Sequence, residues 1–322
     1  MAMSTAPDLS SAAAVRGGVL RRRDLEACGL SARQLRQLVA GGVLDRVHRD
    51  AYYLPGPQDR PSDRYAAAVR AVTWSDPARI LTGPAALSLL GLPVFGSPNA
   101  IHGGIDRRGG SSVRSIVSTV ALPPADQRCE RGGTVLATPA RAALDTARLH
   151  SLVAGVVAAD HALRAGVATT DELARVVASM KGLPRVARAR LCCDLASGDS
   201  ESPGESWSAV VLHEHGIPRP ERQQPFDDEA GRIGRTDFWW PDARVAGEFD
   251  GRVKYGRLNP SGRPPEEVLW SEKLREDRLR SIGLTVVRWT VADLRRPTVW
   301  IQRLGRAIHR SPVRLTGMSV SR

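Results

Sequence analysis

Three carboxylate residues and a lysine stand close together in the last third of the chain. Asp237 precedes the pair Glu248 and Asp250, and Lys254 follows them. Glu248 and Asp250 are two residues apart, so on a β-strand their side chains share one face, and a short turn before this strand would bring Asp237 opposite them. Three converging carboxylates repel one another unless a cation lies between them. Because all of their donor atoms are oxygens, the pattern predicts Mg²⁺ or Mn²⁺ rather than zinc.

Lys254 and Glu205 are further candidates for catalysis, and each also has a simpler structural explanation. Lys254 is one of only three lysines in the chain. It would stabilise an attacking hydroxide or the charge that develops at phosphorus, or it pairs with Asp250 instead. Glu205 stands three residues after Ser202, the spacing of a helix capping box, which would account for it without catalysis. The hypothesised catalytic set is Asp237, Glu248, Asp250, Lys254 and Glu205, with Asp237, Glu248 and Asp250 as metal ligands.

Hydrophobic periodicity and turn signals predict a regular series of elements around these residues. The expected order is α-β-β-β-α-β, and the last strand is a continuous apolar run, as is typical of parallel pairing. Glu272 and Glu276 are expected to pair with Arg275 and Arg280 on a solvated helix face. The helices are predicted over 201–216 and 271–283, the strands over 221–228, 232–241, 243–251 and 284–290, and the tryptophans Trp239, Trp240, Trp270 and Trp289 are predicted to lie in the core.

This region, residues 201–296, resembles the PD-(D/E)XK nuclease fold, and more closely its very-short-patch-repair-like (Vsr-like) endonuclease relatives. The resemblance implies metal-dependent cleavage of DNA phosphodiester bonds, with Asp237 and Glu248 as metal ligands and Glu205 as a helix-borne acid of the same site. The family's lysine stands two residues after the second acid, where this chain has Asp250, so Lys254 would be a displaced equivalent. The matching residues include Gly204-Glu205-Ser206, Gln223, Arg235-Thr236-Asp237-Phe238, Gly247-Glu248-Phe249-Asp250-Gly251 and Val287-Arg288-Trp289.

The N-terminal region predicts two short helices followed by a β-hairpin. Gly29 would end a helix over 21–28, and Ser31 would cap a second helix over 32–40. Residues 43–54 are interpreted as two strands joined by a turn near Arg49.

A helix, a tight turn, a second helix and a hairpin form a winged helix-turn-helix, which places its second helix in the DNA major groove. The alternative is a packing module whose polar faces are merely solvated. The predicted DNA contacts are Arg33, Gln34, Arg36 and Gln37 on the second helix, and Arg46, His48 and Arg49 on the hairpin.

Residues 15–56 resemble the N-terminal domain of AbiEi-family antitoxins. The matching features are the Gly-Leu-Ser turn at Gly29, the Gly-Val-Leu step at Gly42 and the hairpin sequence that follows. The resemblance implies a winged-helix DNA-binding domain, often autoregulatory, with a cognate toxin as partner. Asp50 stands where the family more often has glycine in the hairpin turn.

Composition and charge favour a nucleic-acid partner. The chain has 322 residues, with 46 Lys and Arg against 34 Asp and Glu, a net charge of +12. Such a charge attracts polyanions. No apolar run approaches the roughly 20 residues that cross a bilayer, and the N-terminus lacks the features of a signal peptide. We therefore expect a cytoplasmic protein that binds DNA and no membrane; the oligomeric state is left open.

Two breaks rich in Pro, Gly and Ser, at 52–63 and 194–206, divide the chain. The expected domains are a winged helix-turn-helix at 1–58, a middle domain at 59–198, a PD-(D/E)XK nuclease-like domain at 199–311 and a flexible tail at 312–322.

The predicted fold class is multidomain α+β and α/β: a winged helix, a helical α+β middle domain and a restriction-endonuclease-like α/β domain. In the middle domain the Ala- and Leu-rich periodicity predicts helices over 64–74, 78–93, 137–149, 152–167 and 171–180, and strands over 99–104 and 111–122. Two functions remain open: a Mg²⁺-dependent DNA endonuclease, or a non-catalytic AbiEi-like transcriptional regulator that keeps a nuclease fold.

Overall fold

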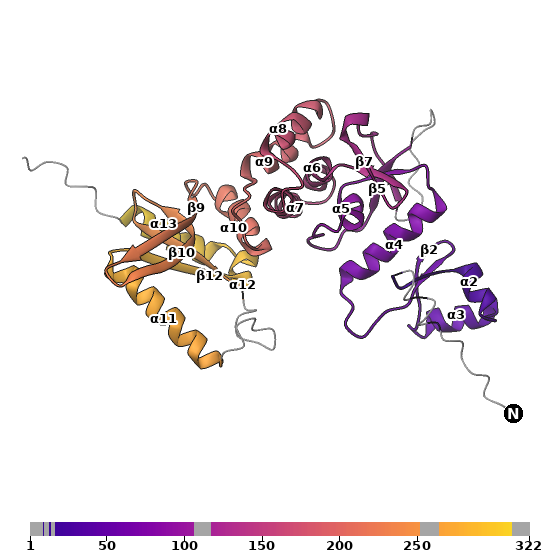
Figure 1. The fold of residues 1–322 in the computed structure, drawn as a ribbon, viewed down its shortest axis with the longest axis horizontal. Coiled ribbons are helices and arrows are strands. Elements are labelled where there is room, and N and C mark those ends of the chain that lie inside the picture. The colour runs from indigo at the N-terminus through magenta and orange to yellow at the C-terminus, as the bar shows by residue number, and fades with distance from the viewer. Residues whose placement is uncertain (1–8, 10–12, 14–16, 106–116, 252–263, 311–322) are drawn as a thin grey trace, which may run out of the picture. The chain divides into compact units, whose positions relative to one another are not determined.

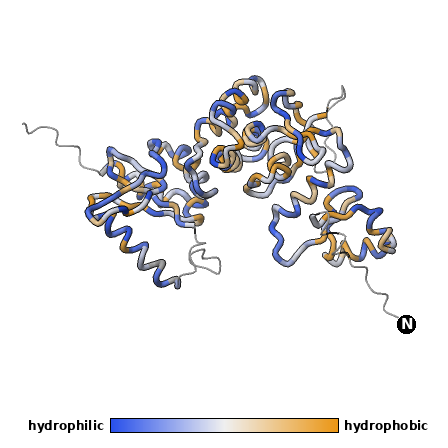
Figure 2. The backbone as a smooth tube through the Cα atoms, in the orientation of Figure 1, coloured by the Kyte–Doolittle hydropathy of each residue, from blue (hydrophilic) through white to orange (hydrophobic). Residues whose placement is uncertain are grey.

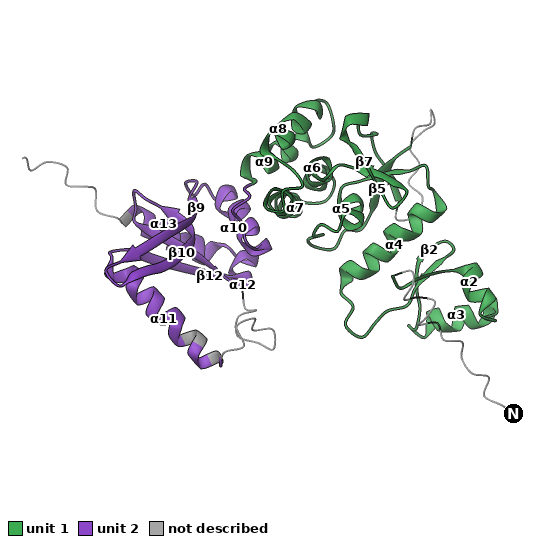
Figure 3. Cartoon of the chain, in the orientation of Figure 1, with its two compact units in different colours: residues 1–196 green, residues 197–322 purple. Residues whose placement is uncertain are grey.

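The structure is a computed structural model, which describes residues 9, 13, 17–105, 117–251 and 264–310 (Figure 1). Its described part is a mixed α+β architecture with twelve α-helices and three separate β-sheets. The chain divides into two compact units, residues 1–196 and 197–322 (Figure 3). The predicted tail at 312–322 lies outside the described residues, and the predicted three-domain division stays a prediction.

The N-terminal part of the first unit follows the order expected from the sequence. Helix α2 (Arg22–Ala27) ends before Gly29, which has a φ of +82°. Helix α3 (Ala32–Ala40) begins after Ser31, whose hydroxyl accepts a hydrogen bond from the backbone N–H of Gln34. Strands β2 (Asp45–His48) and β3 (Ala51–Tyr53) form the expected hairpin. A short strand that the sequence pattern did not indicate, β1 (Val19–Arg21), completes a sheet of order β1-β3-β2.

The residues that hold this part together come from four of its five helices and strands. Leu20 of β1, Leu25 of α2, Leu35 of α3 and Tyr52 of β3 are buried in one hydrophobic cluster, together with Leu44 of the connecting turn. Because Leu35 points into this cluster, the neighbouring polar positions of α3 are turned towards solvent.

The rest of the first unit combines a five-stranded sheet of order β6-β5-β4-β8-β7 with a group of helices. The prediction of a helix over the whole of 78–93 is wrong, because residues 80–82 form strand β4 at the centre of that sheet and a helix begins only at Pro84. The elements are α4 (Pro61–Ser75), β4 (Ile80–Thr82), α5 (Pro84–Leu90), β5 (Ile101–Gly104), β6 (Val117–Thr119), β7 (Arg128–Arg131), β8 (Thr134–Ala137), α6 (Pro139–Leu149), α7 (Leu152–Arg164), α8 (Thr170–Ser179) and α9 (Val186–Leu195).

A buried charge cluster connects helix α6 to strand β4. The carboxylate of Asp145 is fully buried and accepts hydrogen bonds from Arg141 at 2.8 Å and Arg148 at 2.7 Å. The hydroxyl of Thr82 also donates to it, at 2.5 Å. The buried charge of Asp145 is thus compensated by two guanidinium groups, and pairing of this kind is the condition for burying a carboxylate.

The second unit contains the α-β-β-β-α-β order that the sequence predicts. Its sheet has the order β12-β11-β10-β9, with β11 and β12 parallel and the other pairs antiparallel (Figure 1). Two C-terminal helices, α12 and α13, were not predicted. The elements are α10 (Pro203–Glu214), β9 (Glu221–Asp228), β10 (Gly231–Trp240), β11 (Val245–Asp250), α11 (Pro265–Ser281), β12 (Thr285–Thr290), α12 (Val291–Arg295) and α13 (Thr298–Arg310).

An aromatic cluster forms the core of this unit. The rings of Trp289 and Trp300 stack with centroids 4.6 Å apart, and Phe238 packs against Trp289 at 5.2 Å. Burial of Trp239, Trp240 and Trp289 is confirmed, but the prediction for Trp270 is wrong: it is 60% exposed on α11. Helix α11 is mostly hydrophilic (Figure 2), and Trp270 is an exposed apolar residue on it.

None of the helices in the described ranges is both long and apolar enough to cross a membrane.

Candidate functional site

The strand ends of the second unit surround a polar cavity of about 340 Å³. Asp237 of β10 and Glu248 and Asp250 of β11 all line it, so the three predicted metal ligands share one cavity. Three arginines, Arg235, Arg275 and Arg288, line it as well. The cavity is therefore not a purely acidic site, because it brings together charges of both signs.

Asp237 reaches this cavity because of the register between β10 and β11. Phe238 pairs with Gly247 in antiparallel register, which sets Asp237 opposite Glu248, as the sequence predicts. The Oδ2 atom of Asp237 accepts a hydrogen bond from the backbone N–H of Phe249 at 2.8 Å. The side-chain amide of Gln223 lies 3.5 Å from its Oδ1 atom. These contacts fix the carboxylate against the adjacent strand.

Glu248 is held by arginines. Its side chain belongs to a residue only 7% exposed, and Arg288 on the parallel neighbour β12 lies directly beside it in register. The Nη2 atom of Arg288 is 2.8 Å from Oε2, and the Nη2 atom of Arg275 is 2.7 Å from Oε1. The Arg275 contact is an ion pair that lacks the alignment of a hydrogen bond. These guanidinium groups reduce the repulsion among the carboxylates.

Arg288 serves three carboxylates at once. Besides Glu248, it approaches Glu276 at 3.1 Å and Glu272 at 3.3 Å, both on α11. Burial by itself lowers the pKa of Arg288, but Glu248, Glu276 and Glu272 together outweigh burial and raise it. The expected pair of Glu276 with Arg280 is confirmed at 2.5 Å. Glu272 differs from the expectation, because its carboxylate pairs with Arg288 on strand β12.

Asp250 is the third carboxylate of the cavity. Its Oδ1 atom is buried and has no hydrogen-bond partner in the described part of the protein. A buried carboxylate oxygen without a donor is costly, which makes it a position where a cation would be stabilising. Nevertheless, no group of three or more His, Cys, Asp or Glu residues among the described positions is arranged closely enough to hold a metal ion.

Glu205 is buried at the start of α10 and does more than cap the helix. Its Oε1 atom accepts from the Ser202 hydroxyl at 2.7 Å, and its Oε2 atom accepts from the backbone N–H of Glu201 at 2.8 Å. The expected capping box is therefore shifted by one residue, since the return bond goes to Glu201 and not to the Ser202 backbone. The Gln223 amide also donates to Oε2, at 3.0 Å.

Gln223 connects Glu205 to Asp237, a role in the site that its residue type alone does not indicate. It has a φ of +52° within strand β9, an uncommon backbone conformation for a residue other than glycine. Its place in the nuclease-like motif was the available signal. Arg275 and Arg288 were missed as well, because their spacing in the sequence gives no hint that they meet Glu248. Lys254 lies outside the described residues.

The exposed face of α3 carries the predicted DNA contacts of the first unit. Arg33, Gln34, Arg36 and Gln37 are all exposed, while Leu35 is buried. Gln34 also helps to cap α3. Its Oε1 atom accepts hydrogen bonds from the backbone N–H of Ser31 at 2.9 Å and from the Ser31 hydroxyl at 2.7 Å. Arg33, Arg36 and Gln37 are therefore the residues of this face without a capping role.

The hairpin presents the other predicted contacts near its turn. The Arg46 guanidinium donates to the backbone carbonyl of Arg49 at 2.7 Å, which closes the turn. Arg49 itself is exposed. His48 is half-buried, and burial lowers its pKa, although Asp50 opposes this effect. His48 is therefore a poorer cation than the two arginines.

The chain is similar to one protein family, to two curated proteins and to a solved structure. Residues 8–55 match the family described as "Transcriptional regulator, AbiEi antitoxin". Two proteins of Mycobacterium tuberculosis, "Uncharacterized protein Rv2248" and "Uncharacterized protein MT2308", are each 31% identical over 204 residues, which cover 63% of this chain and 72% of theirs. A solved structure, "Crystal structure of RV2827C protein from Mycobacterium tuberculosis", is 18% identical over 69% of this chain and 87% of that one, with a TM-score of 0.36. That structural likeness is too low to support a fold assignment. The chain belongs to the same family as these two uncharacterized mycobacterial proteins, and it carries an AbiEi antitoxin domain of the transcriptional-regulator type at its N-terminus.

Proposed function

We propose that this protein is a DNA-binding transcriptional regulator of the antitoxin class, which contacts DNA through a winged helix-turn-helix at its N-terminus. The single observation that carries the proposal is the match of residues 8–55 to the AbiEi regulator family. The geometry of the described residues supports it, since α2 and α3 are followed by a hairpin and the polar face of α3 is open to solvent.

In this proposal α3 enters the major groove, and the hairpin contacts the phosphate backbone. Arg33 and Arg36 are the contacts of greatest weight, because a guanidinium binds guanine edges and phosphates with paired donors. Arg46 and Arg49 would contact phosphates beside the groove. The net charge of +12 adds a general attraction to DNA. A cognate toxin is the protein partner that membership of the antitoxin class suggests.

The test is fluorescence anisotropy with the DNA that lies upstream of the protein's own gene, compared with a scrambled duplex. The double variant Arg33→Ala/Arg36→Ala should bind at least about tenfold more weakly. Its salt dependence should be shallower by about one unit of slope per lost phosphate contact. The matched control is Arg175→Ala, an exposed arginine on α8. Equal binding by the double variant and the control would refute the proposed interface.

A second candidate function, phosphodiester hydrolysis, is favoured by the cavity of the second unit. The observation is that Asp237, Glu248 and Asp250 line one cavity in which the Oδ1 atom of Asp250 has no described hydrogen-bond donor. The three carboxylates are not arranged closely enough here to hold a metal ion, so they would have to approach one another to bind Mg²⁺ or Mn²⁺. Either ion would then supply an activated water and stabilise charge on phosphate. Arg275 and Arg288 would have to release Glu248 before it could serve as a ligand.

The other residues of this cavity would prepare the substrate rather than hold the metal. Glu205 and Gln223 orient Asp237 through hydrogen bonds, which is a positioning role. Arg275 and Arg288, once released, would attract the phosphate backbone of DNA. Lys254 remains the candidate for stabilising the transition state.

The hydrolysis proposal is tested by nicking of supercoiled plasmid with Mg²⁺ and with Mn²⁺. Asp237→Asn should lose activity, whereas Asp242→Asn, which changes an exposed turn acid on the same unit, should keep it. Calorimetric titration of the full chain with Mn²⁺ gives a second readout that needs no turnover. DNA binding without cleavage and without Mn²⁺ binding would leave the regulator as the sole function.

A further inference from the structure

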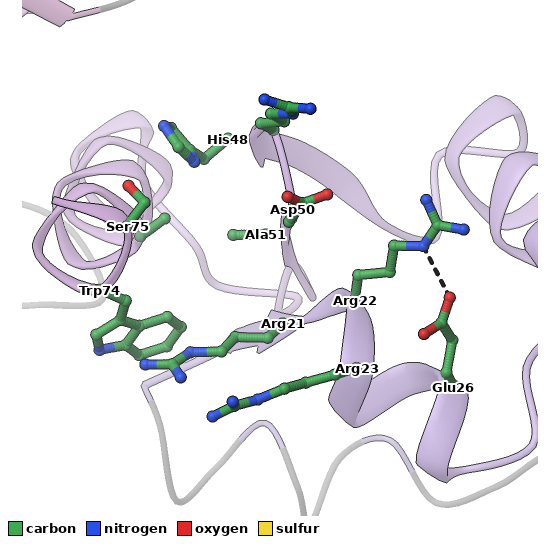
Figure 4. A pocket seen from close by; sticks show the side chains of 11 residues that line it. Arg21, Arg22, Arg23, Glu26, His48, Asp50, Ala51, Trp74 and Ser75 are labelled. Carbon is green, nitrogen blue, oxygen red and sulfur yellow. Dashed lines mark hydrogen bonds and ion pairs between the residues drawn. The ribbon is translucent and has the colours of Figure 1, made fainter.

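A second cavity, of about 690 Å³, lies within the first unit between the start of α2, the hairpin turn and the end of α4 (Figure 4). Its walls carry four arginines, Arg21, Arg22, Arg23 and Arg49, and the ring of Trp74. Neither proposed function uses Trp74 or the start of α2. A concave site of this size with a few convergent polar groups is typical of small-ligand sites.

Four arginines line this cavity against two acids, Glu26 and Asp50, so its net charge favours an anion. Arg22 is neutralised by Glu26 at 2.8 Å and turns towards it in Figure 4. Arg23 has its nearest carboxylate oxygen, from Asp24, only at 3.9 Å. Within the described ranges Arg49 has no carboxylate at ion-pair distance, and the buried Nε atom of Arg21 has no hydrogen-bond partner. Guanidinium donors in this state suit a phosphate group, which accepts paired hydrogen bonds.

The cavity also offers a planar surface. The guanidinium carbon of Arg21 lies 4.6 Å from the centroid of the Trp74 ring, and the two groups are seen side by side in Figure 4. Trp74 is only partly buried. Nucleobases stack on aromatic rings and on arginine guanidinium planes, so the Arg21–Trp74 pair suits a flat heterocycle.

We propose that this cavity binds a mononucleotide. Arg23 and Arg49 hold the phosphate, and the base extends the stack of Arg21 and Trp74. Arginine side chains and the indole of Trp74 all line the cavity, so a ligand with both a phosphate and a flat base would use both kinds of group. The proposal shares Arg49 with the DNA-binding proposal, whereas Arg23 and Trp74 belong to the nucleotide proposal alone, so variants of these two residues separate the two proposals.

Isothermal titration calorimetry of the full chain tests the proposal with adenosine 5′-monophosphate as the probe. Ribose 5-phosphate lacks the base and adenosine lacks the phosphate, so each should bind at least about tenfold more weakly than the nucleotide. Arg23→Ala and Arg49→Ala should each weaken nucleotide binding by about tenfold or more. Because both side chains are exposed, these variants should fold. The control Arg175→Ala should bind as the unaltered protein does.

The ring is tested separately by two substitutions of Trp74. Trp74→Leu should lose most of the affinity for the nucleotide while Trp74→Phe keeps a stacking surface and retains more of it. The proposal is overturned if adenosine, guanosine and thymidine monophosphates all fail to bind at ~1 mM. It is also overturned if the two arginine variants bind like the control, or if they weaken binding of a DNA duplex while nucleotide binding is absent.

Discussion

Glu248 and Arg288 lie beside each other on the parallel strands β11 and β12, and their side chains form an ion pair of 2.8 Å. Glu248 is the residue that the sequence predicts as a metal ligand. In the described structure its carboxylate neutralises one end of a guanidinium that also faces α11. The same residue therefore serves the stability of the sheet and, in the hydrolysis proposal, the chemistry of the cavity.

Replacing Glu248 by Gln should destabilise the second unit by about 1–3 kcal/mol. The change leaves Arg275 and Arg288 facing each other without the carboxylate that separates them, and uncompensated charges near the interior are costly; their partial exposure reduces the cost. Urea unfolding of the full chain, followed by tryptophan fluorescence, measures the effect. Asp242→Asn, at an exposed position, should leave the midpoint unchanged. A midpoint for Glu248→Gln that equals that of the control would show that the arginines do not depend on Glu248.

Substitution by alanine should change the stability of the fold in opposite directions at Gly204 and at Gly305. A Cβ atom at Gly204 would overlap the ring of Phe249, whereas one at Gly305 in α13 meets nothing within 4 Å. Gly204→Ala should cost about 1–3 kcal/mol through overpacking. It should also disturb Asp237, because the backbone N–H of Phe249 donates to its carboxylate. Gly305→Ala should stabilise α13 by up to about 1 kcal/mol. Thermal unfolding of both variants checks the pair, and an equal shift in the two would contradict it.

Asp145→Asn should be among the most destabilising single changes in the first unit. The carboxylate is fully buried between Arg141 and Arg148, so its neutralisation leaves two guanidinium groups without compensation. We expect a loss of about 3–5 kcal/mol. Thr82→Val removes one hydrogen bond to the same carboxylate and should cost about 1–3 kcal/mol. Circular dichroism melts of the two variants measure the difference. A larger loss of stability for Thr82→Val than for Asp145→Asn would contradict the charge argument.

His102 should make the first unit less stable in mild acid. Burial lowers its pKa, and the positive charges of Arg148 and Arg185 act in the same direction, although Asp145 opposes them. The folded protein therefore holds the ring neutral, while the unfolded chain binds a proton near the ordinary pKa of about 6.5. Its contribution is complete above that pH and is lost as the pH falls towards the lower folded pKa.

The measurement is the unfolding midpoint of the full chain across the range from neutral to mildly acidic pH. His102→Gln should flatten the profile, because the substitution removes this titration. His48 and His161 also have lowered pKa values and titrate in the same sense, so the comparison with the unaltered protein isolates His102. Parallel profiles for the two proteins would rule out the predicted role of His102.

Local sequence signals determined most of the secondary structure of both units. Ser31 and Gly29 predicted the ends of α3 and α2, because caps and glycine turns act within a few residues. The strand over 221–228 was predicted at the bounds that β9 has. The signal failed at 78–93, where a run of three residues, Ile80–Thr82, is too short for its period to distinguish a strand from a helix.

The sequence by itself also determined that Asp237, Glu248 and Asp250 share one place, because the alternation of side chains and a tight turn are local properties of the chain. Only the tertiary structure decided what surrounds them. Arg275 and Arg288 come from α11 and β12, and their approach to Glu248 depends on the parallel pairing of β11 with β12. Such contacts join residues that are far apart in the chain, so their spacing in the sequence does not predict them. The charge balance of the site depends on these contacts.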